Sequence, residues 1–363
     1  MGNTFGRLFT LTTFGESHGA AVGCVVDGCP SGLELSLSDI QAELNRRRPG
    51  QSKVTTSRSE ADEARILSGV FEGKTLGTPI AMVIQNRDAD PSKYLRIRDT
   101  PRPGHADLTW RMKFGHVDWR GGGRSSARET VSRVAGGAVA KKLLGEFDVH
   151  TVAFAREIGG VECDTDFVFT KSVRKVINGN PVRTLDKKTA KLMEDVILDV
   201  KAAGDSVGGI IECVTVGVPA GLGEPVFDKL NADLAKALLS VPAVKGVEFG
   251  AGFNLAWMAG SEANDEFIVR GGNVLTRSNN SGGIQGGISN GMPIVLRVVV
   301  KPTASIAKKQ RTINLRTKKP ASIQVEGRHD PCIVPRAVPV VEAMVNLVLA
   351  DHGLISGFIP RKL

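Results

Sequence analysis

One glycine-rich turn carries the first residues that could do chemistry, and the chemistry is anion binding. Residues 119–129 place three consecutive glycines before Ser126 and Glu129, whose spacing is that of a capping box. A helix is therefore expected to begin after Ser126 and to run to about Leu144. Glycine lets the backbone approach a ligand closely, and a helix N-terminus favours an anion. Three arginines belong to the same turn: Arg120, Arg124 and Arg128. The pattern predicts an anion-binding turn, although it lacks the Gly-Lys-Ser/Thr ending of a P-loop.

Three of the six histidines lie in polar turns beside glycine, arginine or an acidic residue. They are His18 in residues 15–19, His105 in residues 102–107 and His329 in residues 327–332. A histidine in such a turn can transfer a proton near a bound anion. Their spacing does not match a metal-binding pattern, so we expect proton transfer and no metal site.

Residues 15–19 also match the G-x-S-x-G pattern of a nucleophile elbow. That motif needs a strand, a sharp turn and a helix, whereas a strand-like run follows Ser17 here. A serine hydrolase is therefore the less favoured enzyme alternative.

The charge balance is basic, with 47 Lys and Arg against 38 Asp and Glu and a formal net charge of +9. Such an excess suits nucleic acid or a small polyanionic ligand. The basic residues cluster beside glycine and proline, as in residues 46–50 and 102–105, and the single tyrosine leaves little for base stacking. We favour a cationic pocket over the alternative, a basic nucleic-acid-binding protein.

Hydrophobic periodicity predicts strands and helices in both halves of the 363-residue chain. Ser38 and Gln41 have capping-box spacing, so a helix is expected from about Ser38 to Pro49. Residues 85–118 show no sustained period and are expected to form a functional loop. The other expected strands and helices cover residues 20–27, 66–71, 79–84, 209–216 and 294–300 for strands, and 185–203, 226–241 and 336–350 for helices.

Two sequence patterns recur in the same order in the two halves. Residues 28–33 (Gly-Cys-Pro-Ser-Gly-Leu) return as residues 217–222 (Gly-Val-Pro-Ala-Gly-Leu). The glycine spacing of residues 69–80 returns in residues 283–294. The repeat predicts one domain over residues 1–363, built from similar halves at about 1–150 and 200–350.

The cellular setting is expected to be a reducing cytoplasm. The five cysteines are odd in number and widely spaced, and no C-x-x-C pair occurs. We expect no signal peptide, no myristoylation and no membrane-spanning segment.

Five motifs in this order make the chain resemble the chorismate synthase family over essentially its whole length: residues 13–19, 46–50, 102–107, 120–129 and 327–332. The resemblance implies an α+β fold, a β-α-β sandwich with helices between two antiparallel four-stranded sheets. It also implies a carbon–oxygen lyase of the shikimate pathway. The enzyme would convert 5-enolpyruvylshikimate 3-phosphate to chorismate and phosphate by 1,4-anti elimination.

The resemblance further implies an obligatory cofactor, reduced FMN, and a homotetramer. The substrate and FMN together carry about six negative charges, which arginine forks can neutralise. NADPH use is uncertain, because an external flavin reductase is expected to supply the reduced flavin. Neither nucleic acid nor a membrane is expected as a partner.

Residue roles follow from the same resemblance. His18 resembles the residue that keeps the flavin protonation state, His105 the one that assists phosphate departure, and Asp330 the partner of flavin N5. The residues that resemble substrate clamps are Arg47, Arg48 and Arg128. The residues that resemble the flavin site are Arg124, Ser125, Ser126, Pro242, Ala243, Gly286, Lys301, Pro302, Thr303, Ala304, Ser305 and Arg328. Arg47 and Lys53 are candidate NADPH contacts, although many relatives have arginine where this chain has Lys53.

Overall fold

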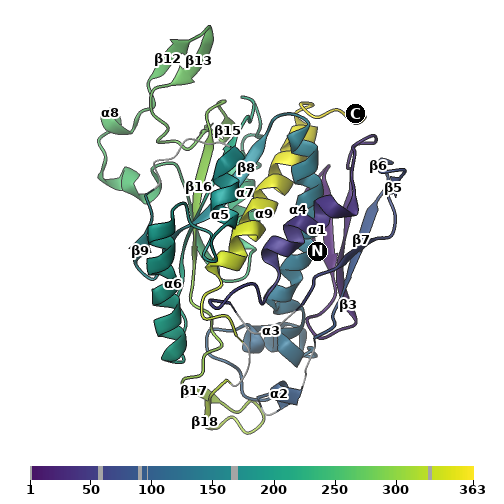
Figure 1. The fold of residues 1–363 in the computed structure, drawn as a ribbon, viewed down its shortest axis with the longest axis vertical. Coiled ribbons are helices and arrows are strands. Elements are labelled where there is room, and N and C mark those ends of the chain that lie inside the picture. The colour runs from purple at the N-terminus through teal and green to yellow at the C-terminus, as the bar shows by residue number, and fades with distance from the viewer. Residues whose placement is uncertain (1, 56–59, 89–91, 96, 165–170, 326–328) are drawn as a thin grey trace.

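Two antiparallel sheets face each other across a layer of helices in the computed structural model (Figure 1). The structure describes residues 2–363 except 56–59, 89–91, 96, 165–170 and 326–328. The first sheet has the strand order β1-β2-β3-β7-β4, and the second has the order β11-β16-β10-β8-β9. The strands of the first are β1 (Thr4–Phe5), β2 (Thr10–Phe14), β3 (Ala21–Asp27), β7 (Ile80–Gln85) and β4 (Ala64–Ile66). Those of the second are β11 (Val244–Phe249), β16 (Ile294–Val300), β10 (Gly209–Val216), β8 (His150–Ile158) and β9 (Val161–Glu162).

The α+β class agrees with expectation, but the number of strands does not. Each sheet has five strands instead of four. The extra edge strands β1 and β9 are two residues long, so they leave no periodic pattern that a sequence could reveal.

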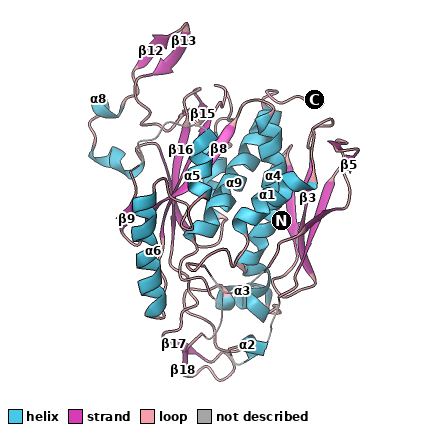
Figure 2. Ribbon diagram, viewed as in Figure 1, coloured by secondary structure: helices cyan, strands magenta, loops and turns pink. Residues whose placement is uncertain are grey.

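The helical layer is built around two long helices that pack against each other, α4 (Thr130–Gly145) and α9 (Val334–Ile355). Helix α4 packs on β2 and β3 of the first sheet, whereas α9 packs on β8 and β10 of the second (Figure 2). Two further helices, α1 (Leu37–Arg47) and α7 (Leu230–Leu239), pack against α9. Burial of apolar side chains from both sheets against these helices forms one continuous core.

Helix α9 is long and apolar enough to cross a membrane by length and composition alone. However, 94% of its most apolar 18-residue window is buried inside the protein. Its composition therefore reflects its place at the centre of the core.

The helix starts differ from the predicted ones by local capping. Helix α1 begins two residues early because Ser36, not Ser38, forms the capping box with Asp39. Ser126 caps a 3-10 turn, Ala127–Glu129, by accepting a hydrogen bond from the Arg128 N–H. Glu129 pairs instead with Arg133, so the predicted box at Ser126 does not form.

Residues 85–118 contain two short helices, α2 (Ser92–Leu95) and α3 (Asp107–Phe114), where only a loop was expected. Helix α3 buries none of its residues, so it has no apolar stripe to signal it. Both helices lie near the lower end of the molecule in Figure 1, close to the hairpin of β17 (Gln310–Ile313) and β18 (Pro320–Ile323).

The remaining elements lie outside the two main sheets and the central helices. They are the hairpins β5–β6 (Val70–Phe71, Lys74–Thr75), β12–β13 (Phe267–Arg270, Asn273–Thr276) and β14–β15 (Ile284–Gln285, Ile288–Ser289), the helices α5 (Lys171–Asn178), α6 (Lys187–Ala202) and α8 (Gly260–Ala263), and the 3-10 segments Arg120–Ser125 and Gly252–Trp257.

The two repeated sequence patterns form matching hydrogen bonds. In the first half, Thr75 accepts from the Leu33 N–H and donates to the Pro30 carbonyl. In the second half, Ser289 accepts from the Leu222 N–H and donates to the Pro219 carbonyl. The strand orders β2-β3-β7-β4 and β8-β10-β16-β11 also correspond.

Candidate active site

A cavity of about 190 Å³ collects side chains from distant parts of the chain at the end of the molecule that holds α2. Of the residues predicted from sequence, those that line it are Arg47, His105, Ser126, Arg128, Thr303, Ala304, Ser305, His329 and Asp330. Two further arginines, Arg102 and Arg336, also line the cavity, so its described wall carries four guanidinium groups against the two carboxylates of Glu60 and Asp330.

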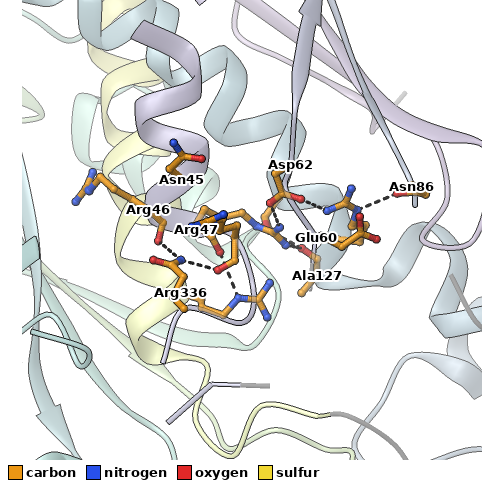
Figure 3. A network of polar contacts seen from close by, with 12 residues as sticks. Asn45, Arg46, Arg47, Glu60, Asp62, Asn86, Ala127 and Arg336 are labelled. Atoms are coloured by element: carbon orange, nitrogen blue, oxygen red, sulfur yellow. Dashed lines mark hydrogen bonds and ion pairs between the residues drawn. The ribbon is translucent and has the colours of Figure 1, made fainter. Parts of the chain in front are cut away.

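Two of these arginines share one buried carboxylate. Asp62, with a side chain that is 0% exposed, accepts hydrogen bonds from Nη1 of Arg47 at 2.8 Å and from Nη1 of Arg128 (Figure 3). Burial alone would raise the pKa of Asp62, but the charges of the two arginines outweigh it and hold the pKa below its ordinary value. Two guanidinium groups for one carboxylate leave an excess positive charge at the cavity.

Arg47 is fixed further by neutral acceptors at the start of α4. Its Nε donates to Thr130 Oγ1 at 3.2 Å, and its Nη2 donates to the Ala127 carbonyl at 3.1 Å. Burial, together with the neighbouring charges of Arg336 and Arg128, lowers the pKa of Arg47 to about 10 despite its pairing with Asp62. Such a site favours binding of an anion, because the anion would stabilise the charged guanidinium.

Asn86, at the end of β7, links Arg128 to the turn that carries His18. Its Oδ1 accepts from Arg128 Nε at 2.9 Å, and its Nδ2 donates to the carbonyls of Glu16 and Gly19. The side-chain amide of Asn86 therefore holds both Arg128 and the 15–19 turn in place.

His105 is oriented by the acid two residues later. Its Nδ1 lies 2.9 Å from Asp107 Oδ1, which also accepts from Arg102 Nη2 at 2.8 Å. Burial raises the pKa of Asp107, but hydrogen bonds from Arg102 and His105 lower it well below its usual range, so the carboxylate stays ionised. We therefore assign the Nδ1 proton to His105, which leaves Nε2 as the nitrogen available to a ligand. Arg102 also donates to Ser305 Oγ at 3.1 Å.

The three consecutive glycines separate the two histidines. Their φ values of 59°, 84° and 53° lie in the left-handed region that glycine adopts readily. A Cβ at Gly121 would lie 2.1 Å from the His18 ring, and one at Gly122 would lie 3.1 Å from His105 Cε1. The His18 ring also contacts Tyr94, which lines the cavity. Glycine is required here because both imidazoles pack against bare backbone.

Replacing Gly121 with alanine is expected to lower turnover at least about tenfold, because the added methyl group must displace His18. Gly115→Ala is the matched control: Gly115 has φ 70°, but nothing lies within 4 Å of its would-be Cβ. Both variants place alanine at a positive φ, but only Gly121→Ala adds a clash with His18, and steady-state kinetics compare the two. Equal turnover in the two variants would contradict the role assigned to this contact.

The predicted anion-binding turn contributes one arginine to the cavity. Arg128 lines it, whereas Arg120 pairs with Asp118 at 2.8 Å. Arg124 donates to the Thr13 carbonyl at 2.7 Å, and Ser125 donates to the Gly122 carbonyl. The structure thus brings together fewer of these side chains than the sequence suggested.

Several other candidates lie away from the cavity wall. Arg48 and Lys53 are exposed, and neither lines the cavity. Ala243 follows Pro242 and accepts a hydrogen bond from the Lys301 N–H, and Lys301 Nζ donates to the Gly104 carbonyl. Pro302 follows directly and precedes the three cavity residues 303–305. Arg328 lies outside the described residues.

Gly286 does not line the cavity. It connects β14 to β15, and β15 lies near the upper end of the molecule in Figure 1, whereas α2, which contributes Tyr94 to the cavity wall, lies near the lower end. No atom lies within 4 Å of a Cβ built on Gly286, so this turn is open at the surface.

Sequence reasoning missed several residues of the site. Arg102 and Asp107 lie within the motif 102–107, where their alternation with His105 was a usable signal. Asp62 and Asn86 stand in no motif, because their arginine partners Arg47 and Arg128 are 15 and 42 residues away in the chain. Arg336 lies just outside the motif 327–332, six residues after its partner Asp330.

Comparison with known proteins matches the chain to one family. A family model described as chorismate synthase matches residues 9–354. The chain is 57% identical to the chorismate synthase of Methanosarcina mazei, over 100% of this chain and 99% of that protein. It is 54% identical to that of Methanothermobacter thermautotrophicus, over 99% and 96% respectively. A crystal structure of chorismate synthase superposes with a TM-score of 0.78 at 35% identity, covering 96% of this chain and 93% of the other. The chain belongs to the chorismate synthase family.

Proposed function

We propose that this enzyme converts 5-enolpyruvylshikimate 3-phosphate to chorismate and inorganic phosphate by a 1,4-anti elimination. The observation that carries the proposal is the shared cavity, in which four arginines meet an oriented histidine. The substrate bears two carboxylates and a phosphate, and arginine forks suit both groups.

The chain's own residues would have two roles: some would bind the substrate's anionic groups, and others would transfer protons. Arg47 and Arg128 would hold the substrate anions, and the exposed Arg48 would join them once its side chain turns toward the cavity. His105, whose Nδ1–H is directed at Asp107, would as the imidazolium donate its Nε2 proton to the departing phosphate and be left as the neutral Nδ1–H tautomer. Asp330 would assist transfer of the proton lost from substrate C6.

The residues present also fit reduced FMN. Two buried polar atoms, Arg124 Nη1 and Thr303 Oγ1, lack a hydrogen-bond partner in the described part of the chain, as a site for an anionic ligand would require. When bound, reduced FMN supplies electron density to the reacting substrate. The chain would hold it with Ser125, Ser126, Arg328 and residues 301–305, and His18 would maintain its protonation state. We propose that an external reductase reduces the flavin. Arg47 and Lys53 are the candidate contacts for the alternative, in which this chain binds NADPH itself.

We propose that the chain, one domain of two similar halves acting in the cytoplasm, assembles as a homotetramer. An arm of residues 252–276 exposes large apolar side chains, of which Trp257 is 87% exposed and Phe253 is 77% exposed. A second copy would cover such a surface. Assembly would also give Gly286 and residues 242–243 a part in a neighbouring copy's flavin site.

Changing Trp257 to glutamate is expected to convert the tetramer into smaller species, because a charge would be buried at the interface. Sedimentation equilibrium measures the mass directly. Phe71→Glu, at an exposed apolar residue of the distant β5–β6 hairpin, is the control and should leave the mass unchanged. A tetramer that survives Trp257→Glu would remove the arm from the interface.

The proposed activity is tested by anaerobic incubation of the protein with 5-enolpyruvylshikimate 3-phosphate and reduced FMN. Chorismate and phosphate should form in equal amounts, and oxidised FMN should support neither. Failure to form chorismate with reduced FMN would overturn the proposal.

A further inference from the structure

A second cavity, of about 280 Å³, lies beside the C-terminal end of α1. Three arginines line it, Arg46, Arg183 and Arg336, together with side-chain amides and hydroxyls. No carboxylate is among the described residues of its wall. Arg336 also lines the first cavity, so the two cavities are neighbours.

Arg183 is the unusual member of this wall. It is only 7% exposed, and its three hydrogen bonds go to neutral oxygens of the described chain. Nη1 donates to Asn178 Oδ1 at 2.9 Å, and Nη2 donates to the Arg46 carbonyl at 2.6 Å and to Gln51 Oε1 at 3.3 Å. Since a guanidinium has five N–H groups, two remain for a ligand.

The neighbouring arginines have carboxylate partners, and Arg183 does not have one among the described residues. Arg46 pairs with Glu43 and Glu342, and Arg336 pairs with Asp330. Burial and the charge of Arg46 lower the pKa of Arg183 to about 10, although the carboxylates of Glu342 and Glu43 act in the opposite direction. A buried arginine held only by neutral acceptors is a costly arrangement that an anion would relieve.

A second unsatisfied group belongs to a residue of the same wall. Ser52, which also lines this cavity, has a buried Oγ without a hydrogen-bond partner in the described chain. The backbone around Arg183 is held by three hydrogen bonds. Asn180 donates to the Thr184 carbonyl and accepts from the Thr184 N–H, and the Arg183 carbonyl accepts from the Ala155 N–H of β8. The donors are therefore fixed in place before any ligand arrives.

We propose that this second cavity is a phosphate-binding site in which Arg183 and Ser52 are ligands. The phosphate group has two sources that share this chemistry, inorganic phosphate and the monoester of a nucleotide. The preference for inorganic phosphate rests on the proposed function, because phosphate would leave the active site next to Arg336. Binding of a phosphate group does not rest on it.

Isothermal titration calorimetry of the full chain tests the site. Inorganic phosphate is titrated into protein saturated with 5-enolpyruvylshikimate 3-phosphate without flavin, so that the active site is filled. Wild type should bind one phosphate, and Arg183→Gln should weaken that binding at least about tenfold, as expected for a charge-assisted contact. Lys175→Gln removes an exposed cation of α5 outside the cavity wall and should bind as wild type does. A second variant, Ser52→Ala, should weaken binding without altering the buried charge.

The separate titrations distinguish a failure of the phosphate-site proposal from a failure of the proposed function. If the enolpyruvyl substrate gives no heat in the absence of flavin, phosphate titrated alone still reports on Arg183, and the chorismate assay with reduced FMN decides the proposed function separately. Adenosine 2′-monophosphate, titrated in parallel, identifies a nucleotide source if it binds more tightly than inorganic phosphate and needs Arg183. The proposal is overturned if neither ligand binds wild type, or if Arg183→Gln and Ser52→Ala both bind as wild type does.

Discussion

Replacing His105 with alanine is expected to lower turnover by about 100-fold or more, with a much smaller change in KM. This is the low end for loss of a general acid. His105 lines the cavity, and Asp107 fixes its Nδ1, so its Nε2 is the nitrogen placed to protonate the departing phosphate. Anaerobic single-turnover kinetics measure the effect on the chemical step itself.

His116→Ala is the matched control for that experiment. His116 lies in the same segment but is exposed and does not line the cavity, so its loss should leave turnover within about twofold. Asp107→Asn should produce a partial loss, because the asparagine no longer fixes the imidazole tautomer. Full activity of His105→Ala would exclude this histidine from the mechanism.

The second large effect is expected at Asp62. Changing Asp62 to asparagine should lower the free energy of unfolding by about 3–5 kcal/mol, because Arg47 and Arg128 would be left buried without a counter-ion. Activity should fall as well, since both arginines line the cavity. Urea denaturation measures the stability, and Glu63→Gln, at an adjacent and exposed carboxylate, should change it little.

The pH dependence gives a separate check of the same ion pair. The pKa of Asp62 is lower in the folded protein, so its contribution is fully present above the unfolded value of about 3.9. It is lost as the pH falls from there through the folded pKa. The stability difference between wild type and Asp62→Asn should therefore shrink in strong acid. A difference independent of pH would show that the charge of Asp62 is not the cause.

Strands and helices could be predicted from the sequence where one face of the element is buried and the opposite face is not. Strands β10 and β16 have the expected bounds, because apolar residues of β16 alternate between the core and a less buried face. Helix α3 was not predicted, because it buries none of its residues and therefore has no apolar stripe along one face. The capping of α1 was misplaced by two residues, because Ser36 and Ser38 both precede residues able to complete a box.

The candidate site was predictable as motifs but not as a network. His105, Arg47 and Arg128 were all named from sequence, and the structure brings them to one cavity. Asp62 joins two of them through contacts that span 15 and 66 residues, and no local pattern encodes such a pairing. The position of Gly286, far from the cavity of its own chain, follows from the fold of the second half, which motif spacing does not specify.

The most direct measurement is a crystal structure of the protein with FMN and 5-enolpyruvylshikimate 3-phosphate bound together. If the basic turns form one binding site, the substrate's anionic groups should lie within hydrogen-bond distance of Arg47 and Arg128. The substrate phosphate should lie at His105 Nε2, and the flavin should lie beside the substrate. Substrate bound on another surface, with these three side chains still turned toward an empty cavity, would contradict this prediction.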